Sequence, residues 1–288
     1  MDIRFVDRLS DLAPRYDGFI LDLWGVIHDG AAPLPGAVEC LAALREEEKR
    51  VALLSNAPRR AADVVAQITR IGVPPLYDHV MSSGEEAWQH LFRRDDPFYA
   101  QLGRRCLHIG SERDTGMRAG LPLEFVDDVA EAELILNTGP AGWDDRLDDY
   151  DPVLQAARAR DLPMICANPD LVVLYRGRLA LCAGALARRY EELGGRVRWH
   201  GKPHPAIYDT CLTLLGIADR ARILAIGDSI STDIAGAAAA GLDSLLIAGG
   251  VHAEEFAAAD GALDPERVGA ALAAVARRPV GIARRLRW

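Results

Sequence analysis

Short apolar segments and longer helical patterns alternate along most of this chain of 288 residues. The apolar segments that predict buried strands are residues 19–21, 51–54, 223–226 and 245–248. Helical patterns lie between or after them, at residues 36–49, 59–71 and 232–240. Because such strands pair in parallel and are covered by the helices that connect them, the alternation predicts an α/β fold with a mainly parallel sheet.

A second series of the same kind interrupts the first. Its predicted strands are residues 106–109, 134–137 and 164–167. We therefore predict a core domain made of residues 1–83 and 189–288, with a smaller α/β domain of residues 84–188 inserted into it. The length of the chain agrees with this division, since a domain takes about 150 residues.

Acidic residues outnumber basic ones, with 42 Asp and Glu against 33 Lys and Arg and a net charge of −9. A field of this sign repels phosphate backbones and anionic lipid head groups, so we expect no general affinity for nucleic acid or for membranes. The arginine-rich C-terminal segment is the exception, and we expect it to be a solvated end.

The cysteines and the N-terminus indicate a cellular compartment. The five cysteines form no C-x-x-C pair and several lie in apolar runs, which predicts buried reduced thiols instead of disulfides or a zinc site. The N-terminus lacks the basic start and apolar core of a signal peptide, and no apolar run reaches about 18 residues. We therefore expect a cytoplasmic protein.

Polar side chains follow several of the predicted strands, where parallel sheets bind their ligands. They are Asp22, Ser55 with Asn56, Lys202 and Asp228. Carboxylates that follow two different strands can hold Mg²⁺ between them, because this ion prefers oxygen ligands. The hydroxyl of Ser55 and the amide of Asn56 can donate hydrogen bonds to an anion, and the ammonium of Lys202 can offset its charge. Any one of these residues alone is more often a turn residue, but the combination predicts a phosphoryl-transfer site with an aspartate nucleophile.

These segments resemble motifs of the haloacid dehalogenase superfamily. The matching stretches are Asp22-Leu23-Trp24-Gly25-Val26, Leu53-Leu54-Ser55-Asn56, Gly201-Lys202-Pro203, Gly227-Asp228-Ser229-Ile230-Ser231-Thr232-Asp233 and, in the predicted insertion, Ala167-Asn168-Pro169-Asp170. The resemblance runs from about residue 17 to residue 251. It is closest to the class IIA subgroup, whose members have a Rossmann-like core and a large α/β cap of the C2 type, and it implies a hydrolase.

Residue by residue, the resemblance assigns the catalytic and phosphate-binding roles. It implies that Asp22 is the nucleophile and that Lys202 supplies the charge that steadies both nucleophile and phosphate. Ser55 would donate a hydrogen bond to the phosphoryl group. Asn56 would add backbone or amide contacts to the substrate.

The resemblance also implies a magnesium site. Asp22 and Asp228 would bind Mg²⁺ directly, and Asp233 would orient either the waters of the metal or the lysine. Gly25 and Gly227 are expected at turns where a side chain would crowd the site.

Trp24 departs from the family pattern. Phosphatases of the family usually carry a second aspartate at this position, which acts as general acid and then as general base. The backbone carbonyl of Trp24 can still bind the metal and its ring can contact the substrate, but the ring cannot transfer a proton. Because such transfer is worth about 10² to 10⁴ in rate, we expect slow turnover unless the leaving group is good. His28 and Asp29 are possible substitutes, although a polar pair there often only makes a turn.

The leading hypothesis is a Mg²⁺-dependent phosphatase that acts on a small phosphorylated metabolite through an aspartyl phosphate. One alternative is a protein that binds a phosphorylated ligand, or regulates through it, without turnover. Another is a hydrolase of carbon–halogen bonds, against which Asp228 and Asp233 count because that reaction needs no metal. The resemblance also allows a homodimer formed through the cap, and it leaves the substrate open.

Overall fold

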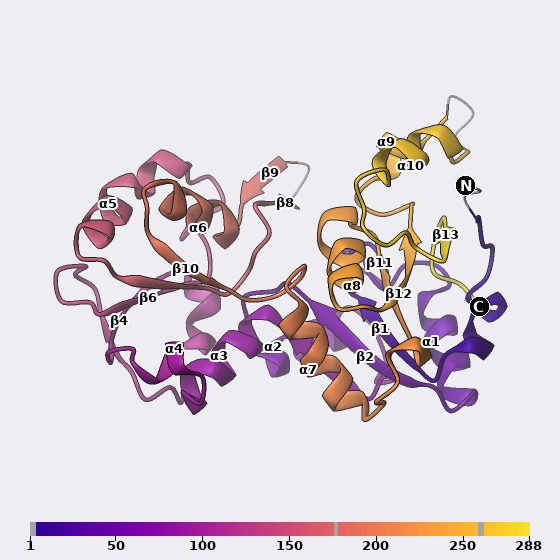
Figure 1. Cartoon of the computed structure of the whole chain (residues 1–288), viewed down its shortest axis with the longest axis horizontal. Helices are drawn as coiled ribbons and strands as arrows, with labels where there is room; N and C mark the ends of the chain where they lie inside the picture. Colours follow the sequence, from indigo (N-terminus) through magenta and orange to yellow (C-terminus); the bar gives the residue numbers. More distant parts are fainter. Residues whose placement is uncertain (1–3, 176–177, 259–261) are drawn as a thin grey trace. The chain divides into compact units, whose positions relative to one another are not determined.

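The computed structural model describes residues 4–175, 178–258 and 262–288, and its contacts divide the chain into two compact units. The first, here called the core unit, consists of Met1–Ser55, Val65–Met81 and Lys202–Trp288. The second, called the inserted unit, consists of Asn56–Val64 and Ser82–Gly201. Both are drawn in Figure 1, coloured along the sequence.

The core unit contains a six-stranded sheet among the described residues, with the order β13-β12-β11-β1-β2-β3. Its strands are β1 (Gly18–Asp22), β2 (Arg50–Ser55), β3 (His79–Ser82), β11 (Ile223–Gly227), β12 (Asp243–Ile247) and β13 (Gly281–Ala283). β1 lies in the middle and pairs in parallel with both β2 and β11 (Figure 1). Every residue of β1 is buried, as expected for a strand covered on both faces.

Helices connect these strands and bury their apolar sides against the sheet. They are α1 (Ala37–Glu46), α2 (Ala61–Arg70), α7 (Pro205–Leu215), α8 (Ala235–Ala239), α9 (Ala253–Phe256) and α10 (Pro265–Ala271). In one apolar cluster, Ile207 and Cys211 of α7 pack with Ile20 of β1 and Leu54 of β2. Burial of an aliphatic side chain of this size contributes about 1.5–3 kcal/mol, so α7 is fixed firmly beside the carboxyl end of β1.

The inserted unit contains a parallel five-stranded sheet with the order β10-β7-β6-β4-β5 in the described part of the chain. Its strands are β4 (Arg105–Ile109), β5 (Glu124–Val126), β6 (Leu134–Asn137), β7 (Pro163–Cys166) and β10 (Arg196–Trp199). A separate antiparallel hairpin is formed by β8 (Val172–Tyr175) and β9 (Arg178–Leu181).

Alternate residues of β6 point to opposite faces of this sheet. Leu134 and Leu136 join the cluster that contains Leu91 of α3 (Ser83–Arg93) and Tyr99 of α4 (Pro97–Ala100), whereas Ile135 joins the cluster of α5 (Asp151–Ala159) and α6 (Ala183–Glu192). Because successive side chains of a strand point to opposite faces of the sheet, β6 packs against helices on both faces. The inserted unit is a three-layer α/β domain in its own right.

The predicted α/β class is confirmed, with a Rossmann-like core and an insertion. The insertion found by contacts is longer than the predicted 84–188, since it extends to Gly201 and includes 56–64. A boundary at residue 188 would cut through α6 and would separate β10 from its partner β7. The predicted boundary falls too early because β10, with the half-polar sequence Arg-Val-Arg-Trp, has no clear strand pattern.

The two ends of the described chain meet in the core unit. The backbone of Val6 donates to the Ile282 carbonyl and the backbone of Leu9 donates to the Arg287 carbonyl, at 2.8 Å each. The arginine-rich end is therefore not merely a solvated tail, because it carries the edge strand β13. Its Arg284 and Arg285 side chains are nevertheless exposed, as expected.

Two simpler expectations can also be compared with the structure. All five cysteines are free and buried, as predicted. Within the described ranges, none of the helices combines the length and the apolarity needed to span a bilayer.

Candidate active site

Asp22 ends the central strand of the core sheet. It pairs in register with Leu54, the residue before Ser55, and is only 8% exposed. The strands β1 and β2 are apolar up to this point, so they carry a carboxylate and a hydroxyl to the same edge of the sheet. This is the edge at which parallel sheets bind their ligands.

Lys202 joins two aspartates at this edge. Its Nζ atom donates to Oδ1 of Asp22 at 2.5 Å and to Oδ1 of Asp233 at 2.7 Å. All three side chains are buried. Burial alone would lower the pKa of Lys202, but the two carboxylates outweigh it and hold that pKa well above its usual value. The ammonium therefore stays charged and fixes the position of Asp22.

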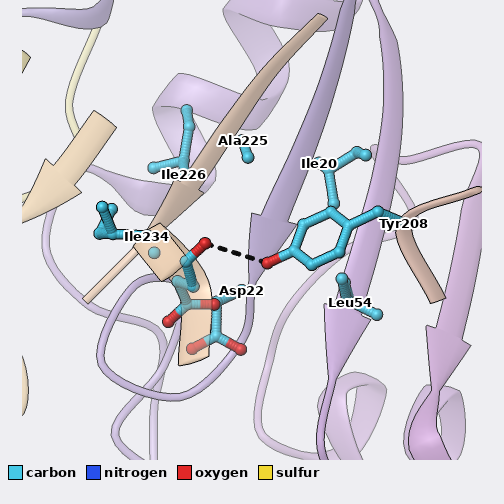
Figure 2. A pocket seen from close by; sticks show the side chains of 9 residues that line it. Ile20, Asp22, Leu54, Tyr208, Ala225, Ile226 and Ile234 are labelled. Carbon is cyan, nitrogen blue, oxygen red and sulfur yellow. Dashed lines mark hydrogen bonds between the residues drawn. The ribbon is translucent and has the colours of Figure 1, made fainter. Parts of the chain in front are cut away.

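Asp233 is held by its own loop. It lies on a short π-helical segment, Ile230–Ile234, and its Oδ2 accepts from the backbone of Ser229 at 3.1 Å. The hydroxyl of Tyr208 donates to its carbonyl at 3.1 Å, and Figure 2 marks this bond with a dashed line. A Cβ at Gly227 would lie 2.1 Å from Cγ of Asp233, which confirms that this turn needs glycine.

Asp228 follows β11 and is surrounded by backbone. Its Oδ2 accepts from the Val251 amide at 2.7 Å. A Cβ at Gly25 or at Gly250 would come within 2.1 Å of the same oxygen, so both loops pass close to this carboxylate. The expectation for Gly25 is confirmed. Gly250 and Val251 were not predicted, although a Gly-Gly pair after the strand at 245–248 is a signal for such a close approach.

Three carboxylates in this cluster point to a cation. One oxygen from each of Asp22, Asp228 and Asp233 lies within 4.8 Å of the others. Burial and mutual repulsion raise the pKa of Asp22 and raise that of Asp228 to about 6. When all three carboxylates are ionised, Lys202 supplies a single positive charge against three negative ones, so the site is short of positive charge. An oxygen donor set with excess negative charge fits a hard divalent ion.

A small cavity of about 10 Å³ lies behind Asp22. It is bounded by Ile20 and Leu54 from the sheet and by the ring of Tyr208 (Figure 2). Space of this size holds about one water molecule at most. The space behind Asp22 is therefore too small for any ligand larger than a water molecule.

Trp24 lies just beyond Asp22, in the loop after β1. Its side chain is 45% exposed, and its ring meets that of His28 edge to face at 5.8 Å between centroids. Nδ1 of His28 accepts from the Gly30 amide at 3.0 Å, and burial lowers the pKa of this histidine. Asp29 accepts from the amides of Ala31 and Ala32, which is an ordinary turn. No carboxylate stands at position 24.

Asn56 belongs to the inserted unit by its contacts. Its Nδ2 donates to Oδ1 of Asp170 at 2.8 Å, and Asp170 in turn donates its amide to Asn168. A Cβ at Gly201 would lie 2.6 Å from Oδ1 of Asn56. Asn56 thus holds the Asn-Pro-Asp loop of its own unit. Of the predicted site residues, the structure brings Asp22, Lys202, Asp228 and Asp233 into one cluster, with Ser55 on the neighbouring strand.

Sequence and structure comparisons place this arrangement in a known class. A family model described as haloacid dehalogenase-like hydrolase matches residues 19–120, and a related hydrolase model matches residues 199–275. A hydrolase of the haloacid dehalogenase-like family from Brucella suis is 39% identical, with a TM-score of 0.83 over 98% of this chain and 100% of that one. The chain belongs to the haloacid dehalogenase-like hydrolases.

Two further comparisons concern a mycobacterial enzyme. D-glycerol 3-phosphate phosphatase of Mycobacterium tuberculosis is 29% identical over 85% of this chain, and the match spans 66% of that protein's length. A crystal structure of glycerol phosphate phosphatase from the same organism, in complex with magnesium, is 27% identical, with a TM-score of 0.66 over 94% of this chain and 76% of that one.

Proposed function

We propose that this hydrolase is a Mg²⁺-dependent phosphatase of a small phosphorylated metabolite, with Asp22 as its nucleophile. The observation that carries the proposal is the buried contact of Lys202 with both Asp22 and Asp233. The mycobacterial relative, a glycerol phosphate phosphatase, supports the reaction class, and the magnesium complex of that enzyme supports the metal.

The charge at the site explains why these residues suit phosphoryl transfer. A carboxylate approaches a phosphate monoester only if the negative charge of both groups is offset. Lys202 offsets part of that charge at Asp22, and the hydroxyl of Ser55 stands on the neighbouring strand to hold a phosphoryl oxygen. Asp233 keeps the ammonium in place.

The metal fits the remaining donors. The residues that would hold Mg²⁺ are Asp22, Asp228 and the carbonyl of Trp24, with Asp233 close by. When bound, the ion would neutralise the phosphoryl oxygens and help to align them with the nucleophile.

The reaction then proceeds in two displacements. In the first, a carboxylate oxygen of Asp22 forms a bond to phosphorus while the bond from phosphorus to the ester oxygen breaks. In the second, water attacks phosphorus, the bond to Asp22 breaks, and inorganic phosphate leaves with the carboxylate restored. Lys202 enters the reaction protonated, since Asp22 and Asp233 hold its pKa high.

The site has no side chain at position 24 that can transfer protons. The departing ester oxygen needs a proton and the attacking water must lose one, but the indole of Trp24 cannot serve either step. We propose that protons are exchanged with solvent instead. Turnover is then governed by the leaving group, and it is slow for alkyl phosphates.

The acidic balance supports a small substrate and disfavours nucleic acid and membranes. The inserted unit corresponds to the family's cap, and we propose that its loops select the substrate. A cytoplasmic location and a homodimer formed through the cap belong to the same proposal.

The experiment is a screen for phosphate release from phosphorylated metabolites in Mg²⁺, with the native chain and Asp22→Asn side by side. Release by the native chain that disappears in the variant supports the proposal. Release that persists in Asp22→Asn contradicts the covalent mechanism.

Trp24 favours one second candidate, a protein that binds a phosphorylated ligand without turning it over. A Mg²⁺-dependent thermal shift with such ligands, without phosphate release from any of them, would establish that alternative in place of catalysis.

A further inference from the structure

A cluster of metal-binding side chains lies within the inserted unit, made entirely of its own residues. Glu86 and His90 stand four residues apart on α3 and therefore on one face of that helix. His200 follows directly after β10. One carboxylate oxygen and one ring nitrogen from each histidine lie within 4.8 Å of one another.

Glu86 carries an unsatisfied buried oxygen. Its side chain is 3% exposed, and Oε2 accepts from Nδ1 of His200 at 3.0 Å and from the Gly201 amide at 3.1 Å. Oε1 is buried and accepts no hydrogen bond from the described residues. A buried carboxylate oxygen without a partner costs free energy, so this atom calls for a ligand.

The two histidines offer nitrogen donors. His90 is half-buried, stacks on Tyr99 at 5.1 Å between centroids, and faces the His200 ring at 5.3 Å. Burial lowers the pKa of His90, which favours the neutral ring with a free lone pair. The Tyr99 hydroxyl is hydrogen-bonded to Nε2 of His200. Ligating histidines commonly have such a partner on their second nitrogen, which fixes the ring.

We propose that Glu86, His90 and His200 form a binding site for a divalent transition metal of the zinc type, separate from the aspartate cluster. Imidazole and carboxylate donors suit Zn²⁺, while Mg²⁺ prefers oxygen alone. Three protein ligands leave a fourth position for water.

The existing contacts need little change to accept the ion. His200 changes tautomer: Nδ1 gives up the proton that it shares with Oε2 of Glu86, Nε2 takes up a proton from solvent, and the metal binds between Nδ1 and the Glu86 carboxylate, whose Oε1 has no other partner among the described residues. Bonds of about 2.1 Å in a tetrahedral arrangement separate ligand atoms by roughly 3.4 Å, against 3.0 Å in the structure. The Tyr99 hydroxyl then accepts from the protonated Nε2.

Cobalt is the probe for this site, because its visible spectrum reports the ligands and geometry without reference to activity. The full chain is stripped with a chelator, saturated with Mg²⁺, and titrated with Co²⁺ and then with Zn²⁺ in competition. We expect one Co²⁺ per chain, with a spectrum typical of tetrahedral nitrogen and oxygen ligation, and displacement by Zn²⁺.

Four variants test which residues bind the cobalt ion that gives this spectrum. His90→Gln should weaken binding at least about tenfold, and so should Glu86→Gln if it folds. His252→Gln removes a histidine that pairs with Glu255 in the core unit at 2.7 Å, and should leave binding unchanged. Asp22→Asn, which disturbs the aspartate cluster, should also leave it unchanged.

Three results would overturn the proposal. They are absence of Co²⁺ and Zn²⁺ binding in excess Mg²⁺, undiminished binding by a folded His90→Gln variant, and loss of the signal in Asp22→Asn. Because His90 is only half-buried, its variant should fold and decide the question even if Glu86→Gln does not.

Discussion

The ammonium of Lys202 lies 2.5 Å from the carboxylate of Asp22, although 180 positions separate the two residues in sequence. The contact joins the carboxyl end of β1 to the segment that follows β10. It is buried, and Asp233 completes it from a third segment. The site thus depends on three distant parts of the chain being in place together.

Replacing Asp22 should abolish turnover. In Asp22→Asn the amide oxygen is a poor nucleophile, so phosphate release should fall by on the order of 10³ or more. A matched control is Asp17→Asn, which changes an exposed aspartate paired with Arg222 just before the same strand. Steady-state assays of both variants check this, and equal losses in the two would point to instability of β1 in place of chemistry.

Position 24 should control which substrates are turned over. Trp24→Asp introduces a carboxyl group that can transfer protons, so alkyl phosphates should gain up to about 10² to 10⁴ in rate while aryl and acyl phosphates gain little. Trp24→Asn also removes the ring but cannot transfer protons, and it should not gain. The measurement is kcat across leaving groups of different pKa, and a flat response in all three proteins would contradict this account.

Removing the buried ammonium should destabilise the core. Lys202→Met leaves Asp22 and Asp233 without their counter-ion, so the free energy of unfolding should fall by about 3–5 kcal/mol. Mg²⁺ should restore part of the loss. Lys49, the other lysine of the chain, is the control, and Lys49→Met should stay within about 0.5 kcal/mol. Urea titrations with and without Mg²⁺ test this, and an unchanged midpoint for Lys202→Met would refute it.

A methyl group at Gly25 should disturb Asp228. Gly25 has φ +78°, and its Cβ would lie 2.0 Å from Oδ2 of Asp228. Gly241 has φ +72° with no atom within 4 Å of the same position, so Gly241→Ala carries the backbone strain alone. Both variants should lose about 1 kcal/mol of stability, but only Gly25→Ala should weaken Mg²⁺ binding. Calorimetric titration distinguishes them, and equal affinities would show that the loop adapts.

The inserted unit should lose stability in acid through His108. Its Nδ1 accepts from Arg118 at 2.9 Å, so Nε2 carries the proton and donates to Thr138. Burial, with help from Arg118, lowers the pKa of His108 from 6.5 to about 4. The unfolded chain therefore takes up a proton first as the pH falls, and stability drops between about pH 6.5 and pH 4 by up to about 3 kcal/mol.

The test of this pH dependence is the difference between the native chain and His108→Gln in urea unfolding at several pH values. The difference should shrink as the pH falls through this window. His252→Gln serves as the control for loss of a histidine elsewhere. A difference that stays constant with pH would show that His108 is protonated equally in both states.

Much of the core and its site was predictable because the relevant signals are local. An apolar run that ends in a carboxylate, as at Asp22, marks both a buried strand and the edge of a parallel sheet. The strands β10 and β13 were missed because a half-polar strand and a three-residue strand have no sequence pattern of their own, and only pairing with β7 or β12 defines them.

Contacts made by the backbone, or between residues far apart in the sequence, could not be predicted from the sequence alone. The amide of Val251 on Asp228 and the hydroxyl of Tyr208 on the Asp233 carbonyl depend on how loops pass one another. The same holds for Asn56, which lies next to Ser55 in sequence and yet bonds to Asp170. Adjacent residues can serve different units when a unit boundary falls between them.

The position of β1 between β2 and β11 has a consequence for synthesis of the chain. Gly18 pairs with Arg50 on one side but with Ile223 on the other. All five strands of the inserted unit's sheet lie between Arg105 and Trp199, so that sheet can close on the ribosome while β1 still lacks one neighbour. The apolar strand β1 remains paired on one side only until β11 emerges, and during this interval the nascent chain is most exposed to misfolding.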